Sequence, residues 1–134
     1  MKKVLLLTAI LMLAACGGVK KTQEALNTGN YTTAMNKAIK NLAENKTKKG
    51  NQEYITLLEE AFAKNTDREL QEIAFLQNDG NPANLEKIYN KYLQLKNTQE
   101  RIKPLLPLFI NEEGREARFD FVNYDNRILN TKDD

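Results

Sequence analysis

Residues 31–45 read YTTAMNKAIKNLAEN, and apolar side chains recur in this stretch every three or four residues. That spacing places them on one face of an α-helix. The face comprises Tyr31, Ala34, Met35, Ala38, Ile39 and Leu42. Most of the other positions are polar or charged, so the pattern predicts an amphipathic helix that packs on a partner through this face.

Similar patterns predict further helices on the C-terminal side. After the charged break at 46–50, a second helix starts near Gln52. A capping box at Thr66–Glu69 predicts the start of a third helix. In this motif the threonine side chain accepts a hydrogen bond from a first-turn amide, and the glutamate side chain accepts one from the threonine backbone amide. Gly80 and Pro82 then predict a helix end followed by the start of a fourth helix, over about 82–93. A short fifth helix is expected near Asn97 and Thr98.

Pro104 and Pro107 end the helical pattern. Beyond them, 108–110 and 119–122 are expected to pair as a short β-hairpin across 111–114, because Phe119 and Phe121 alternate with charged residues. The aromatic tail either covers the helical stack or forms an exposed docking patch. A last helix is expected over 124–132, with Asn123 or Asp125 as its cap. The fold class is therefore mostly all-α, built of antiparallel helical hairpins over residues 21–104 with a capping segment at 105–134.

Several functions are disfavoured by residues that the chain lacks. It has no histidine and a single cysteine, so a Ser-His-Asp triad and a histidine-ligated zinc site are excluded. The neighbouring carboxylates Glu59-Glu60 and Glu112-Glu113 diverge on a helix and are expected to be solvated surface. No phosphate-binding glycine motif occurs. We therefore expect no enzyme, no cofactor and no metal site; the alternative is a carboxylate-dependent enzyme acting on cell-wall polymers.

The N-terminus has the layout of an export signal. Lys2 and Lys3 precede a mostly apolar run, 4–15, which is too short to span a bilayer. The run ends in Leu13-Ala14-Ala15-Cys16, which resembles the lipobox of bacterial lipoproteins. The alternative is an ordinary signal peptide with an incidental cysteine.

This resemblance implies that residues 1–15 are cleaved, that Cys16 is acylated, and that 16–20 tether the protein to a membrane. Stable anchoring of this kind takes two or more acyl chains. Gly17 is not the aspartate that retains lipoproteins at the inner membrane in enterobacterial-type sorting. The resemblance therefore favours the periplasmic face of the outer membrane over the inner membrane.

Without Lys2 and Lys3 the chain is formally neutral, so we expect no nucleic-acid partner. Lys46, Lys48 and Lys49 form one basic cluster. It is either a solvated loop or a contact with anionic headgroups or an acidic partner.

The body resembles a tetratricopeptide repeat. The matching residues are Ala25, Leu26, Gly29, Tyr31, Ala34, Ala38 and Leu42, and Leu85–Leu93 repeats part of the pattern. Tetratricopeptide repeats have a period of 34 residues, whereas Asn36-Lys37 and Asn90-Lys91 are 54 residues apart. The resemblance implies paired antiparallel helices and, with the lipobox, a membrane-tethered protein-binding module of the cell envelope.

The binding surface of such a module is expected to include Tyr54, Tyr89 and Tyr92, whose alternative role is core packing. A structural spacer with no specific groove is the other candidate function. Repeat proteins usually need about three repeats and a cap. Either 105–134 is that cap, or the sequence is the front part of a longer protein.

Overall fold

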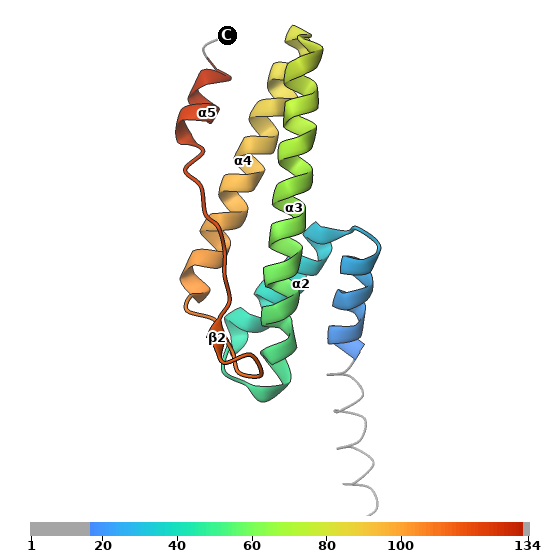
Figure 1. The fold of residues 1–134 in the computed structure, drawn as a ribbon, viewed down its shortest axis with the longest axis vertical. Helices are drawn as coiled ribbons and strands as arrows, with labels where there is room; N and C mark the ends of the chain where they lie inside the picture. Colours follow the sequence, from blue (N-terminus) through green and yellow to red (C-terminus); the bar gives the residue numbers. More distant parts are fainter. Residues whose placement is uncertain (1–16, 133–134) are drawn as a thin grey trace, which may run out of the picture.

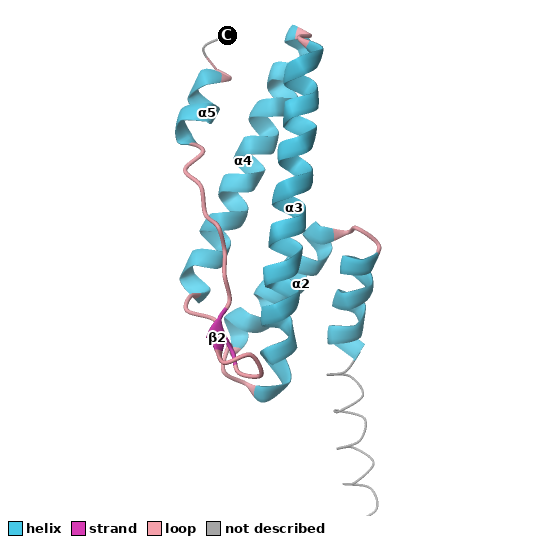
Figure 2. Ribbon diagram, in the orientation of Figure 1, coloured by secondary structure: helices cyan, strands magenta, loops and turns pink. Residues whose placement is uncertain are grey.

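The computed structural model describes residues 17–132, so Leu13, Ala14, Ala15 and Cys16 lie outside the described residues. Figure 2 shows that helices dominate this part of the chain. The helical elements are residues 17–27, α2 (Tyr31–Glu44), α3 (Gln52–Asp79), α4 (Leu85–Ile102) and α5 (Asp125–Asn130). Short 3₁₀ turns are η1 (Lys49–Asn51), η2 (Pro82–Asn84) and η3 (Lys103–Leu105), and the two strands are β1 (Phe109–Ile110) and β2 (Arg115–Glu116).

The expected mostly helical architecture with antiparallel hairpins is confirmed. The long helices α3 and α4 form one hairpin along the molecule, while α2 and residues 17–27 lie beside the lower half of α3 in Figure 1. The C-terminal tail runs back along α4 and ends in α5 (Figure 1). Within residues 17–132, no helix combines the length and apolar character that a membrane crossing requires.

The expectation of two helices over 52–79 is wrong, because α3 is one continuous helix of 28 residues. Thr66 and Glu69 lie in its middle rather than at a cap. Glu69 pairs instead with Lys91 of α4 at 2.8 Å, and Arg68 donates to the Gly29 carbonyl at 2.6 Å. No glycine or proline interrupts α3, so nothing in the backbone breaks it. The expectation of a separate fifth helix near Asn97 is also wrong, because α4 continues to Ile102.

The β-hairpin near the C-terminus is confirmed, but its second strand is not the expected one. Phe109 pairs with Glu116 and Ile110 with Arg115. Gly114, at φ +64°, lies in the tight turn between them. Phe119 and Phe121 do not form a strand. Their rings pack edge-on against Phe62, with centroids 5.5 and 5.7 Å apart. The alternating aromatics therefore cover the helical core from an extended tail.

The buried apolar residues form two clusters along α3. The proximal core joins α2, the first half of α3, the end of α4 and β1; it comprises Leu26, Ala34, Met35, Ala38, Ile39, Leu42, Tyr54, Ile55, Leu57, Leu58, Ala61, Phe62, Ile102, Leu105, Leu108 and Ile110. The distal core joins the second half of α3 to α4 and α5; it comprises Ile73, Ile88, Tyr92, Leu95, Tyr124 and Ile128. The distal half of the molecule is thus held by far fewer buried side chains.

Candidate functional site

A groove of about 930 Å³ opens at the distal end, between α3, α4 and α5. We call it the distal groove. It is lined by Leu70, Ile73, Leu76, Gln77, Gly80, Asn81, Pro82, Leu85, Ile88, Tyr92, Arg127, Asn130 and Thr131. The residues that α3 and α4 contribute are mainly aliphatic, and the polar side chains come mainly from α5 and from the turn that joins α3 to α4. Concave apolar surfaces with a few polar groups are typical of binding sites.

The turn that closes the groove follows from its sequence. Gly80 ends α3 in the left-handed conformation at φ +67°, which glycine adopts without steric cost. The Asn81 side chain accepts from the Ala83 amide at 3.0 Å, and Pro82 occupies the first turn of η2. Asn84 is buried and donates to the Leu76 carbonyl at 3.1 Å and to Asp79 at 2.9 Å. The buried amide therefore locks the two helices at this end.

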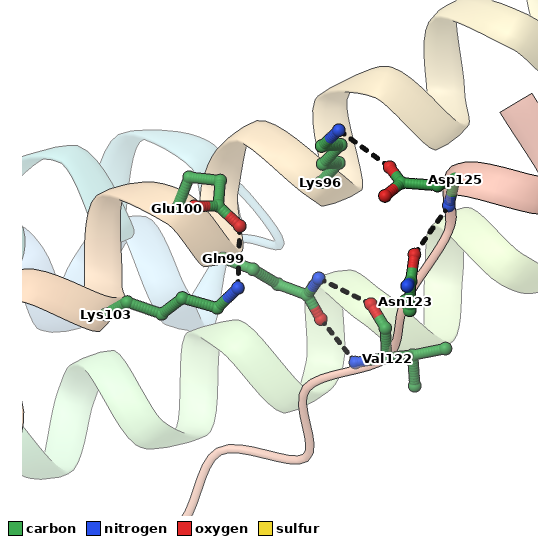
Figure 3. Close-up of polar contacts among 7 residues, drawn as sticks. All are labelled: Lys96, Gln99, Glu100, Lys103, Val122, Asn123 and Asp125. Atoms are coloured by element: carbon green, nitrogen blue, oxygen red, sulfur yellow. Dashed lines mark hydrogen bonds and ion pairs between the residues drawn. The ribbon is translucent and has the colours of Figure 1, made fainter.

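The third wall of the groove, α5, is positioned by the tail (Figure 3). Gln99 of α4 exchanges two hydrogen bonds of 2.8 Å with the backbone N–H and C=O of Val122. Lys96 pairs with Asp125 at 2.7 Å, at the first residue of α5. The expected cap at Asn123 or Asp125 is wrong, because the N-cap of α5 is Tyr124. Asn123 instead accepts from the Asp125 amide at 2.9 Å, in the turn that leads into this helix. Three neighbouring contacts thus fix where α5 begins.

Arg127 carries positive charge at the edge of the distal groove. Its guanidinium carbon lies 5.9 Å from the ring centroid of Tyr92 and 5.8 Å from that of Tyr124, within the range of cation–π attraction. Tyr124 is buried, and that burial raises the pKa of its hydroxyl. Lys132 lies 5.4 Å from the ring of Tyr89. Among the ion pairs of residues 17–132, none includes Arg127.

The three tyrosines expected to bind a partner do not converge on one surface. Tyr92 lines the distal groove and is only 6 % exposed. Tyr89 packs beside the distal core on the same helix. Tyr54 lies in the proximal core near the other end of α3, against Gly18, and burial raises its pKa. Only Tyr89 and Tyr92 therefore belong to the distal end.

Three of the four carboxylates considered for catalysis, Glu59, Glu60 and Glu113, are paired with cations away from the distal groove. The Glu59 carboxylate accepts two hydrogen bonds from the Arg115 guanidinium, at 2.7 and 2.8 Å, and one from the Arg118 backbone amide at 2.6 Å. The hydrogen bond from Arg115 holds the pKa of Glu59 below its usual value. Glu113 pairs with the same arginine, and Glu60 pairs with Lys64. None of these carboxylates lines the distal groove.

Sequence reasoning missed the polar residues of α5 as part of a site. Arg127, Asn130 and Thr131 are spaced three and four apart, so they share a helix face. That spacing is a usable signal, but the element was expected only as an incomplete terminal helix. Gln99 was also missed, although it falls on the apolar stripe of α4 with Leu95 and Ile102.

Comparisons of the chain with protein-family models, with curated proteins and with solved structures found no match. The site is therefore assigned from its own geometry. Within residues 17–132, no group of three or more acidic or cysteine side chains is arranged to hold a metal ion. The groove offers aliphatic walls, amides, a hydroxyl, a tyrosine and one guanidinium, which are groups suited to holding an apolar segment with polar edges.

Proposed function

We propose that this chain is a bacterial lipoprotein that acts as a non-catalytic interaction module in the cell envelope. The lipid on Cys16 tethers it to a membrane, and the distal groove binds a protein or peptide of the envelope. We place it at the periplasmic face of the outer membrane, on the basis of Gly17. No cofactor, metal or nucleic acid takes part in this function.

One observation carries the proposal: Gly18, near the start of the described chain, and the groove lie near opposite ends of α3. Gly18 lies against Tyr54 in the first turn of α3, because a Cβ on Gly18 would come within 2.5 Å of the tyrosine hydroxyl. Gly80, at the other end of α3, lines the groove. The helix rises 1.5 Å per residue, so these two points are about 40 Å apart. A tether at Cys16 would therefore leave the groove far from the lipid and open to partners.

The groove also has the composition of a helix-binding surface. Leu70, Ile73 and Leu76 line it from α3, and Leu85 and Ile88 line it from α4. A groove lined by apolar side chains from two helices can accept the apolar face of a third helix. Gln77, Arg127 and Asn130 are exposed at its edges and can bond to the polar face of such a partner.

The tether is tested by replacing its acceptor. Wild-type chain and the Cys16→Ser variant are expressed with radiolabelled palmitate, and membranes are separated. We expect label and membrane fractionation for the wild type only. A variant that still fractionates with membranes, or a wild type without label, would remove the lipoprotein assignment.

The groove is tested by photo-crosslinking in membranes. A photoreactive residue placed at Gln77 or at Asn130 should capture the same partner, since both positions lie at the groove. The control position is Lys40, which is exposed on α2 away from the groove. A structural spacer would give no reproducible product from any of the three positions.

A further inference from the structure

The end of the molecule beside Gly17 carries an exposed set of lysines, which we call the basic face: Lys20, Lys21, Lys48 and Lys49. Lys20 and Lys49 line one hollow together, so the first helical turn and η1 are neighbours there. Figure 1 places η1 at the lower end of α3, with the blue helical residues 17–27 beside it. The basic face therefore lies where the chain leads to Cys16.

The lysines of the basic face are not committed to contacts within the protein. Among residues 17–132, none of the four makes an ion pair. Lys46, by contrast, donates to the carbonyls of Leu105 and Pro107 at 3.0 and 3.2 Å, so its amino group stabilises the fold.

The acidic groups near this end are fewer on the side of the basic face. Glu24 and Glu53 line the same hollow as Lys20 and Lys49. Glu112, Glu113 and Glu116 belong to the β-hairpin segment, which Figure 1 shows on the other side of α3, and Glu113 is paired with Arg115 there. The four lysines of the basic face thus outnumber the two carboxylates, Glu24 and Glu53, of that hollow.

We infer that the basic face rests on the anionic headgroups of the bilayer that holds the lipid anchor, so that α3 stands away from the membrane with the distal groove outermost. This inference rests on the proposed lipid anchor at Cys16. Acylation would place residues 17–21 at the headgroup level. Each lysine held near an anionic surface strengthens binding by about fivefold. The four lysines would then fix the orientation of a molecule that the acyl chains alone leave free to tilt.

The test uses the purified acylated chain, in which Cys16 is blocked and an added cysteine is the single reactive thiol. Gly50→Cys places a fluorophore beside Lys49, where an added Cβ meets only the Lys48 side chain at 4.0 Å. Asn78→Cys places it on the exposed last turn of α3. The probes are vesicles of phosphatidylcholine, with or without phosphatidylglycerol, that carry a spin-labelled headgroup as quencher.

We expect phosphatidylglycerol to increase quenching at position 50 by about twofold or more and to leave position 78 unchanged. High salt shortens the Debye length to about 3 Å and should remove the increase. The double substitution Lys48→Gln and Lys49→Gln removes two of the four charges and should reduce the increase. The matched control, Lys87→Gln with Lys132→Gln, makes the same charge change at the distal end and should keep it.

Two results would overturn the inference: equal quenching at position 50 in both kinds of vesicle, or an equal increase at positions 50 and 78. Palmitate incorporation is measured in the same preparation. A chain without palmitate would refute the proposed anchor itself, whereas an acylated chain without the phosphatidylglycerol response would refute only the orientation.

Discussion

Gln99 is the residue on which the position of the C-terminal tail depends most directly. Its side chain is 4 % exposed, yet both of its polar atoms are satisfied by the backbone of Val122 at 2.8 Å. A buried amide with two such partners specifies one register between α4 and the tail, because any shift leaves polar groups unpaired. Through Val122 it also sets the start of α5, and hence one wall of the distal groove.

Replacing Gln99 with leucine should therefore destabilise the protein. The Val122 amide and carbonyl would lose their partners, at a cost of about 1–3 kcal/mol in the free energy of unfolding. Urea denaturation measures the change. Gln94→Leu is the matched control, because Gln94 is exposed on the same helix, and it should change stability by less than about 0.5 kcal/mol. Equal losses in the two variants would contradict this account of the tail.

Glu59 links stability to pH through its bond with Arg115. Its pKa is lowered in the folded state, chiefly by that hydrogen bond. A depressed carboxyl pKa adds stability that is present above the unfolded value, about 4.3, and is lost as the pH falls through the folded value. Lowering the pH from neutral into this range should thus cost the wild type more stability than Glu59→Gln. Glu60→Gln, the neighbouring control, should follow the wild type in the same pH series.

At the scale of elements, α3 connects everything else in the molecule. Its first half is buried in the proximal core, and its second half lines the distal groove. Continuity through Thr66 makes the two halves one rigid element, which holds the groove at a fixed distance from the residues next to Cys16. A break at Thr66 would instead give two short hairpins with a hinge between them.

Substitutions at Thr66 distinguish these two structures. Inside a continuous helix, glycine is less favourable than alanine by about 1 kcal/mol. At a helix N-cap the order is reversed, because glycine is preferred over alanine there. We expect Thr66→Gly to be less stable than Thr66→Ala when both are unfolded in urea. The opposite order would mean that a helix starts at residue 66.

The helical elements were largely predictable from sequence because their apolar periodicity and their end signals act locally. Asp79–Pro82 correctly marked the turn between α3 and α4. The capping box misled because its residues found tertiary partners: Glu69 binds Lys91, and Arg68 binds the Gly29 carbonyl. The second strand and the distal groove were not predictable, since both depend on where the tail packs. That packing is set by long-range contacts such as Phe62 with Phe119 and Gln99 with Val122.

At the scale of the whole molecule, the unequal division of the core separates the best-packed half from the half that carries the distal groove. The proximal core combines helices α2, α3 and α4 with β1, whereas the distal core has six buried side chains around an open groove. Regions with few buried apolar contacts open at lower free energy than the best-packed regions. The proposed binding surface in the weaker half could thus adjust to a partner while the half that contains the proximal core stays folded.

Hydrogen exchange should reveal this division. Backbone amides at 73–77 in the distal half of α3 are expected to exchange about tenfold or more faster than those at 55–61, which corresponds to about 1.4 kcal/mol in opening free energy. A segment bound in the distal groove would stabilise only states in which the groove is formed. Captured partner should therefore slow exchange at 73–77 and leave 55–61 unchanged. Uniform exchange along α3 would mean that the molecule opens as a single unit. Slowing at 55–61 alone would mean that the partner binds the proximal half, which would contradict the proposed site.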